Sequence, residues 1–281
     1  MQLIPYLKAF RIHSGLTYVF LSLWAVLYSA FIAETIDLVK PLLLFILLFY
    51  SIRIAFFINN LYDIKEDSVH PNGYKKNPLV ALKNLDRYHV LSVILLVTSF
   101  FLLLCFLISN ILATLAYGIL LILDFIYSAP PRLKNIAILD ILSHGLFFGS
   151  LLVLVPLLAY DIPLSLNMLI ILCSIFLLSM VMELTNHLKD YEYDKMAKVN
   201  TFTAKYGKKI TIVMIKVLFL VGFTLLTLPY VHDILLFIPV SVILFLDIIL
   251  KPKQIGTLTG PLLLISLFLI LGFQFFVFFF S

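Results

Sequence analysis

Long runs of apolar residues, separated by short polar stretches, follow one another along the whole chain. A run of about 20 apolar residues is long enough to cross the hydrocarbon core of a bilayer as a helix. The pattern predicts about nine membrane-spanning helices, at roughly residues 15–33, 40–60, 88–108, 111–127, 137–159, 164–186, 210–228, 232–250 and 258–280. Residues 1–13 carry Lys8 and Arg11 among apolar side chains, which predicts an amphipathic helix on the membrane surface.

The composition supports this reading. Hydrophobic residues make up 63% of the chain and charged residues 12%, which excludes an ordinary soluble domain. We therefore expect an all-α, polytopic membrane protein with a single domain over residues 1–281. Its two halves, roughly 1–135 and 136–281, each hold one of the acidic motifs described below.

Charged residues between the apolar runs divide into two groups. One side of the predicted bundle carries most of the cations: Lys8, Arg11, Lys65, Lys75, Lys76, Lys83, Arg87, Arg132, Lys134, Lys189, Lys195, Lys198, Lys205, Lys208, Lys209, Lys251 and Lys253. The other side holds Lys40, Glu34, Asp37, Asp161 and Asp233. The positive-inside rule then predicts a multi-pass cell-membrane protein with a cytoplasmic N-terminus and an external C-terminus.

Two polar segments on the predicted cytoplasmic side repeat one pattern. Residues 59–67 read NNLYDIKED and residues 186–194 read NHLKDYEYD, so Asn, Leu, Asp and Asp recur at the same relative positions. On a helix, Asn59, Asp63 and Asp67 are spaced at i, i+4 and i+8 and line one face. Acids on one face repel each other unless a cation lies between them, and hard oxygen ligands suit Mg²⁺.

The loops near these motifs are the next feature. Two loops are long, roughly residues 68–87 and 195–209, and each follows an acidic motif, which predicts cytoplasmic lids. A shorter loop, YSAPPRLK at residues 127–134, has two prolines that keep Arg132 and Lys134 close to the membrane surface. Lys75 and Lys76 are interpreted first as surface charge, with a lid role open.

These elements predict a substrate with a phosphate-rich head and a long apolar tail. Mg²⁺ takes some of its ligands from substrate phosphates, and Arg132, Lys134, Lys75 and Lys76 could add hydrogen-bond donors. A polyprenyl diphosphate fits both the charged end and the apolar bundle. Metal ions that neutralise its leaving diphosphate would help break the allylic C–O bond, and aromatic faces in a dry pocket would stabilise the resulting cation.

The chain resembles the UbiA family of membrane prenyltransferases over most of its length. The resemblance rests on the paired motifs, YSAPPRLK at 127–134, KNPL at 76–79, and Thr201 with Tyr206-Gly207 after the second motif. It implies nine helices around a central cavity, with Mg²⁺ and an isoprenoid diphosphate bound by the acidic motifs. One position departs from the pattern, because Asn60 stands where the family motif often has Asp.

The resemblance also implies the site residues. The metal-site residues would be Asn59, Asp63, Asp67, Asp190 and Asp194, the four aspartates among them being the expected catalytic residues, with Asn186 a weaker candidate that we place with the diphosphate. Tyr127, Arg132 and Lys134 would lie near the diphosphate. Glu66 and Glu192 are interpreted as solvated acids without a role.

Ionisable residues inside the predicted spans are costly in lipid and are expected to face the bundle interior. Arg53 would bind either an internal partner or the diphosphate. Asp140 and His144, at i and i+4, could pair directly or position an acceptor, and Glu183 could orient a ligand. Asp124 and Asp247 have no role that the sequence indicates.

The sequence thus predicts an integral membrane, Mg²⁺-dependent prenyltransferase that joins a prenyl group to a lipophilic acceptor. A quinone-precursor aromatic, a glycerol-phosphate ether lipid and a carotenoid end group all remain open as acceptors. One alternative is a terpene cyclase that acts on the prenyl diphosphate alone. A cation transporter is the alternative from another class, although transport favours charges near the bilayer midplane and these acids cluster at one surface.

Overall fold

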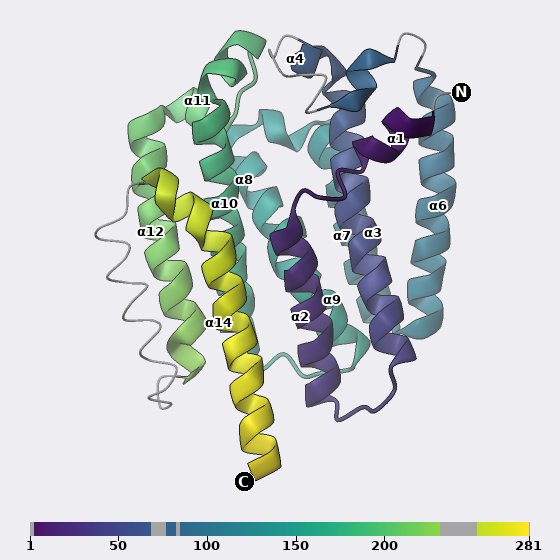
Figure 1. Ribbon diagram of the computed structural model, residues 1–281, viewed down its shortest axis with the longest axis vertical. Helices are drawn as coiled ribbons and strands as arrows, with labels where there is room; N and C mark the ends of the chain where they lie inside the picture. Colours follow the sequence, from purple (N-terminus) through teal and green to yellow (C-terminus); the bar gives the residue numbers. More distant parts are fainter. Residues whose placement is uncertain (1–2, 69–76, 83–84, 231–251, 281) are drawn as a thin grey trace.

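The structure, a computed structural model, describes residues 3–68, 77–82, 85–230 and 252–280. These residues form a bundle of helices and contain no strand (Figure 1). The longer elements are α2 Leu16–Ile32, α3 Val39–Tyr62, α6 Arg87–Ile108, α7 Ile111–Ser128, α8 Ala137–Gly145, the π-helical turn η3 Leu146–Ser150, α9 Leu151–Ala159, α10 Leu166–Ala197, α12 Lys208–Thr227 and α14 Pro252–Phe280. The short elements are α1 Leu3–Ala9, α4 Ile64–Ser68, α11 Phe202–Tyr206, and the 3₁₀ turns η1 Pro78–Ala81, η2 Leu133–Asn135 and η4 Leu228–Tyr230.

The all-α prediction is confirmed for the described residues. Six helical segments in them are long and apolar enough to cross a membrane: 39–62, 87–108, 111–128, 137–159, 166–197 and 208–227. The helix α2 is shorter, with 17 residues, and begins and ends within one residue of its predicted span. The predicted span 232–250 lies outside the described residues, so the count of nine stays a prediction.

One boundary differs clearly from the prediction. The span predicted to end at residue 186 continues to Ala197, so α10 has 32 residues. At 1.5 Å per residue it is about 48 Å long, whereas the hydrocarbon core is about 30 Å thick. It ends at Lys198 in the left-handed conformation, which closes the last turn. The second acidic motif therefore lies on a rigid helix that projects past the apolar part of the bundle.

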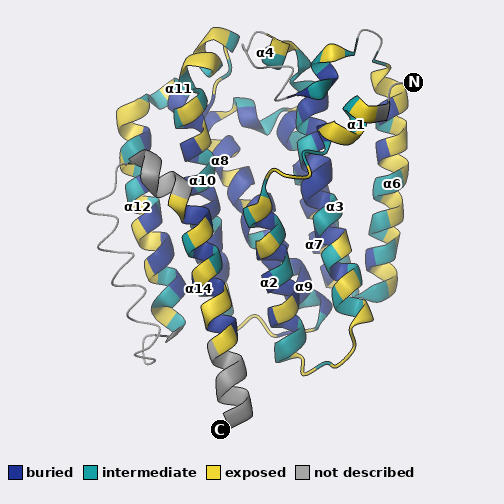
Figure 2. Ribbon diagram, in the orientation of Figure 1, coloured by how far each residue is buried: buried dark blue, intermediate teal, exposed yellow. Residues whose placement is uncertain are grey.

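Polar side chains connect the helices inside the bundle. Ser174 on α10 donates to the carbonyl oxygen of Gly222 on α12 at 2.8 Å, and Trp24 on α2 donates to that of Leu267 on α14 at 2.7 Å. Such bonds stabilise helix pairs in a membrane, where lipid tails compete equally for apolar contacts. Burial is concentrated on the inward faces, and α6 lies at the edge of the bundle with most of its surface exposed (Figure 2).

Of the two predicted lid loops, the first lies largely outside the described residues, as do its Lys75, Lys76 and Lys83. In the second, Thr201 caps the short helix α11 by accepting a hydrogen bond from the backbone N–H of Ala204. α1, α4 and α11 lie at the same end of the bundle (Figure 1). This end carries both acidic motifs.

The close approach of η3 to α10 generates a stability prediction. A Cβ on Gly149 would lie 3.0 Å from Ser179 Cβ and 3.2 Å from the backbone oxygen of Ile175. Gly149→Val should therefore lower the free energy of unfolding by about 1–3 kcal/mol, because the backbone cannot move away cheaply. Thermal unfolding in detergent measures the change. Gly118→Ala is the matched control, since its Cβ would be 3.7 Å from Leu102; an equal loss of stability in both variants would contradict the prediction.

Candidate active site

Both acidic motifs open onto one cavity at this end of the bundle. The cavity encloses about 160 Å³. We call it the central cavity. It is lined by nine of the ten residues that the sequence predicts for the site: Asn59, Asp63, Asp67, Tyr127, Arg132, Lys134, Asn186, Asp190 and Asp194. Arg53 is the tenth and does not line it.

The first motif spans a break in the helix. α3 ends at Tyr62, Asp63 is its C-cap residue, and α4 begins at Ile64. Hydrogen bonds of the helical kind nevertheless continue across the break: the N–H of Asp63 bonds the carbonyl of Asn59 at 2.9 Å, and that of Asp67 bonds the carbonyl of Asp63 at 2.7 Å. The three predicted side chains therefore all reach the central cavity despite the interruption.

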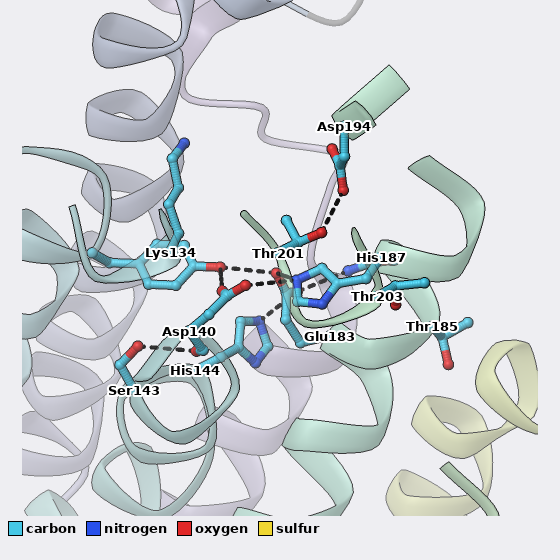
Figure 3. A network of polar contacts seen from close by, with 12 residues as sticks. Lys134, Asp140, Ser143, His144, Glu183, Thr185, His187, Asp194, Thr201 and Thr203 are labelled. Carbon is cyan, nitrogen blue, oxygen red and sulfur yellow. Dashed lines mark hydrogen bonds and ion pairs between the residues drawn. The ribbon is translucent and has the colours of Figure 1, made fainter. Parts of the chain in front are cut away.

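The second motif lies on unbroken helix. Asn186, Asp190 and Asp194 lie on successive turns of α10, and all three line the central cavity. Thr201, after the helix, donates its hydroxyl proton to Asp194 Oδ2 at 2.9 Å (Figure 3). The residue that caps α11 thus also orients an acid of the motif.

Arg132 and Lys134 reach the first motif from the loop after α7. Arg132 has a positive φ of 58°, which turns the chain into η2, and Lys134 follows within that turn. Arg132 Nη2 is 2.9 Å from Asp63 Oδ1, and the ammonium group of Lys134 contacts both oxygens of the same carboxylate. Two cations from a distant segment therefore share Asp63.

The structure corrects the interpretation of Glu66, to which the sequence assigned no role. Its carboxylate accepts a hydrogen bond from Arg132 Nη1 at 2.8 Å, and it lines the central cavity. Partial burial acts to raise the pKa of Glu66, but the hydrogen bond and charge of Arg132 outweigh it and lower the pKa. Arg132 is thus held by two acids of the first motif segment.

The sequence did not indicate that the N-terminal segment contributes a side chain to the site. Arg11 lines the central cavity and donates to the side-chain oxygen of Asn60, whose amide nitrogen donates to the carbonyl of Ala9 at 2.6 Å. Burial lowers the pKa of Arg11, and three cavity acids act against this effect: Asp67, Asp63 and Asp190. Asn60, which stands where the family often has Asp, is fully buried and serves as a structural clamp on this segment.

Asn77 provides a further link from the KNPL segment. Its amide nitrogen donates to the backbone carbonyl of Asn60 at 2.7 Å and to Asp67 Oδ2 at 2.9 Å, while its oxygen caps η1. Because Asn77 is completely buried, this contact fixes the position of Asp67 relative to the end of α3. The described part of the first lid loop therefore supports the acidic motif.

Arg53 is corrected from the expected diphosphate ligands to a structural role. Its Nη1 donates to the backbone carbonyls of Arg11 at 2.6 Å and of Ser14 at 2.9 Å, and its guanidinium stacks over the rings of Phe49 and Phe56. Of the two partners that the sequence left open, the structure selects the internal one. Arg53 anchors the segment between α1 and α2.

A mostly buried polar cluster lies at the inner end of the central cavity. We call it the inner cluster: Tyr127, Asp140, Glu183 and His187, which line the cavity, and the buried His144 behind them. Figure 3 shows Asp140, His144, Glu183 and His187. The sequence left open whether Asp140 and His144 pair directly, and the structure shows other partners for both. Instead, each of the two residues contacts α10: His187 Nε2 lies 3.1 Å from Asp140 Oδ2, and His144 Nε2 lies 3.2 Å from Glu183 Oε2. Asp140 and His144 are neighbours on α8, but each contacts a side chain of α10 instead of the other.

Tyr127 lies between the two acids of the inner cluster. Its hydroxyl oxygen is 2.8 Å from Asp140 Oδ1 and 2.8 Å from Glu183 Oε1. A phenol has one proton and can donate it to only one of these oxygens at a time. His187 Nε2 lies 3.1 Å from Asp140 Oδ2 and 3.3 Å from Glu183 Oε1, so its imidazole also contacts both acids.

Aromatic rings surround the inner cluster. Phe148 stacks on Tyr18 with ring centroids 4.4 Å apart, and Phe147 lies 5.0 Å from the ring of Tyr127 and 5.5 Å from that of His144. Both phenylalanines lie in the π-helical turn η3, an irregularity that often occurs at functional sites. The polar outer part of the site thus passes inward to buried π-faces.

Asp124 is not part of this site, because it is buried on α7 and lines a different pocket. Asp247 lies outside the described residues. Glu192 is an exposed surface acid that pairs with Lys208 at 2.7 Å, as expected for a residue without a role.

The donor set of the central cavity fits divalent cations. Among its described lining residues, seven carboxylates face three Lys or Arg side chains: Asp63, Glu66, Asp67, Asp140, Glu183, Asp190 and Asp194 against Arg11, Arg132 and Lys134. A diphosphate entering this excess of negative charge needs additional cations.

The acids of the two motifs do not converge on one point. Among the described residues, the only trio of His, Cys or acidic side chains with ligand atoms within 4.8 Å of one another is Asp140, Glu183 and His187. Mg²⁺ tolerates such a site, because it completes its shell with water and phosphate oxygens.

Comparisons with known proteins agree with this arrangement. Residues 19–254 match the model of the UbiA prenyltransferase family. No curated protein matches the chain.

Solved structures share the fold. A UbiA homolog from Archaeoglobus fulgidus bound to GPP and Mg²⁺ has a TM-score of 0.71 and 21% identity, covering 95% of this chain and 99% of that one. A digeranylgeranylglyceryl phosphate synthase has a TM-score of 0.69 and 22% identity, covering 94% and 96%. A UbiA homolog from Aeropyrum pernix K1 in apo form has a TM-score of 0.69 and 16% identity, covering 92% and 97%.

The assignment of Arg53 to the N-terminal segment is testable by proteolysis. In Arg53→Met, trypsin should cleave after Arg11 about tenfold faster, because the charged hydrogen bonds that hold this segment are lost. Limited proteolysis in detergent with mass analysis of the fragments measures the rate. Arg132→Met is the control, since Arg132 contacts Asp63 and Glu66 instead. Unchanged cleavage in Arg53→Met would show that the segment is anchored elsewhere.

Proposed function

The chain belongs to the UbiA prenyltransferase family, and we propose that it transfers a prenyl group from a polyprenyl diphosphate to a lipophilic acceptor in the membrane. One observation carries the proposal. Acids from the junction of α3 and α4 and from α10, with cations from the loop after α7, share a cavity whose inner end is buried and surrounded by aromatic rings. This arrangement suits a substrate that is anionic at one end and apolar at the other.

The diphosphate would occupy the outer part of the central cavity. Arg132 and Lys134 now neutralise Asp63, and both could turn toward phosphate oxygens when other cations compensate that acid. Arg11 faces the same space from the N-terminal segment. The residues that would hold Mg²⁺ are Asn59, Asp63, Asp67, Asp190 and Asp194, and when bound the metal would neutralise the charge that develops on the leaving diphosphate.

The prenyl chain would extend toward the aromatic rings at the inner end. There Tyr127 and the phenylalanines of η3 could stabilise an allylic cation by their π-faces while the buried walls exclude water. In the transfer, the allylic C–O bond breaks, diphosphate leaves with the bonding electrons, and an acceptor atom forms the new bond to carbon. The acceptor then loses a proton.

The inner cluster is the group placed to receive that proton. Asp140 and Glu183 both line the central cavity, each 2.8 Å from the hydroxyl oxygen of Tyr127, and a carboxylate of this pair could accept the proton. This placement supports acceptors that carry an ionisable O–H or C–H group. Glycerol-phosphate lipids, quinone-precursor aromatics and carotenoid ends remain the classes to compare, and one of the similar structures is a digeranylgeranylglyceryl phosphate synthase.

The distribution of charge supports a cytoplasmic active site. Both motifs and the described basic loops lie at one end of the bundle, which the positive-inside rule assigns to the cytoplasm. A transporter is less consistent with this arrangement, because the cavity acids end in a hydrogen-bonded inner cluster.

Diphosphate release tests the proposed reaction. Purified protein with Mg²⁺ and geranylgeranyl diphosphate should release diphosphate only when a suitable acceptor from the panel is present, and the product mass should equal acceptor plus prenyl group. Chelation of Mg²⁺ should stop release. Release without acceptor, giving a hydrocarbon or terpene alcohol, would instead identify a cyclase. Ion flux in liposomes without turnover would identify a transporter.

Substitution of the motif acids tests the assignment of the site. Asp63→Asn and Asp190→Asn should each lower kcat on the order of 100-fold, because each removes charge that binds the metal. Steady-state kinetics measure the effect, and thermal unfolding verifies that the variants fold. Glu192→Gln should retain activity, since this exposed acid contacts Lys208 outside the cavity. Normal turnover in both aspartate variants would exclude this cavity as the reaction site.

A further inference from the structure

A second pocket lies on the outer side of the bundle, between α3, α6 and α7. It encloses about 330 Å³, and we call it the lateral pocket. Its walls are mostly aliphatic, with Thr98 and Phe125 among them. Ile58 and Leu121 on its inner side are buried, whereas Leu95 and Ile122 on its rim are more than half exposed. No Lys, Arg or His of the described residues lines it. The pocket therefore opens toward the hydrocarbon of the bilayer.

One carboxyl group in this apolar pocket has no hydrogen-bond partner. Asp124 is 2% exposed, and within the described part of the chain neither of its carboxyl oxygens makes a hydrogen bond. Burying a polar group without a partner costs free energy, and an acid inside a membrane protein is therefore a candidate functional residue. Lipid tails can fill the pocket but cannot satisfy Asp124.

The position of Asp124 defines the shape of the missing partner. It lies one turn from the end of α7 at Ser128, close to the membrane surface at the motif end. The pocket continues along α7 to Gly118, about 9 Å deeper at 1.5 Å per residue. Gly118 has only Leu102 near the place of a Cβ, at 3.7 Å, so the deep end is open. A ligand with a polar head at Asp124 and an apolar chain toward Gly118 fits this order.

We propose that the lateral pocket binds a neutral lipid alcohol, with Asp124 as the hydrogen-bond partner of its hydroxyl group. A hydroxyl can donate to an ionised carboxylate, and it can either donate to or accept from a protonated carboxyl group. A ligand carboxylate would place two acids together, and an ammonium group would bring a second charge into hydrocarbon. The alcohol carries the smallest desolvation cost of the three. This site is separate from the central cavity, because the two share no lining residue.

Photolabelling of the full-length protein in nanodiscs tests the proposal. The probe is a photoreactive diazirine derivative of geraniol, and mass analysis locates the label. We expect labelling of α6 and α7 at the lateral pocket that unlabelled geraniol competes away. The saturated hydrocarbon with the same carbon skeleton should compete poorly, because it cannot bond Asp124. Equal competition by the hydrocarbon would overturn the proposal and leave a surface filled by lipid tails.

Three variants separate the hydrogen bond from the space. Asp124→Leu should weaken labelling roughly tenfold, the loss expected for one hydrogen bond in a dry site, and Asp124→Asn should retain it. Gly118→Leu fills the deep end without touching Asp124 and should also abolish labelling, so the test survives if Asp124→Leu fails to fold. Undiminished labelling in a folded Asp124→Leu or Gly118→Leu protein would refute the site.

A competition with geranyl diphosphate and Mg²⁺ distinguishes the two cavities. Saturation of the central cavity should leave the label on α6 and α7 unchanged, and this result does not depend on turnover. Loss of the label under these conditions would mean that the probe reports the central cavity, and the lateral site would be rejected while the proposed function stands.

Discussion

Carboxylates gathered at one end of a membrane bundle repel each other, and the structure depends on how this repulsion is compensated. Arg132 and Lys134 converge on Asp63 from a loop nearly 70 residues away in the chain, and Arg132 also holds Glu66. Partly buried ion pairs of this kind are costly to break on one side only, because the remaining charge is left without a partner. In the proposed reaction, the same cations would move to the bound diphosphate when metal compensates the acids. Folding and substrate binding would then use one set of charges.

The helices position these charges at the membrane edge in two different ways. α3 ends at its C-cap residue Asp63 and the short helix α4 follows, whereas α10 continues as one rigid helix past its apolar part. Around the break, buried amides replace helical continuity: Asn60 holds the N-terminal segment, and Asn77 holds Asp67. An amide can donate and accept at once, whereas an aspartate at position 60 could not donate to a backbone carbonyl. The departure of Asn60 from the family pattern is therefore consistent with a clamp rather than a lost ligand.

Much of the fold could be read from the sequence, because hydrophobic runs and loop charge obey the local physics of the bilayer. The nine cavity residues were implied by the family resemblance, which rests on local signals such as the repeated motif and YSAPPRLK. The sequence left the partners of Arg53, Asp140 and His144 open. Each contacts a partner on another element, and sequence spacing shows only neighbours on the same helix. Glu66 was dismissed because an acid at a helix end is normally solvated, and only the arrival of Arg132 changes that.

The two kinds of buried acid in this protein lead to different conclusions. Asp140 and Glu183 are costly in isolation, but Tyr127 and His187 contact both of them, so their cluster is a stable part of the folded state. Asp124 has no such network, and its burial is compensated by nothing in the described chain. A satisfied acid indicates chemistry within the protein, whereas an unsatisfied one in an open apolar pocket indicates that the partner comes from the membrane.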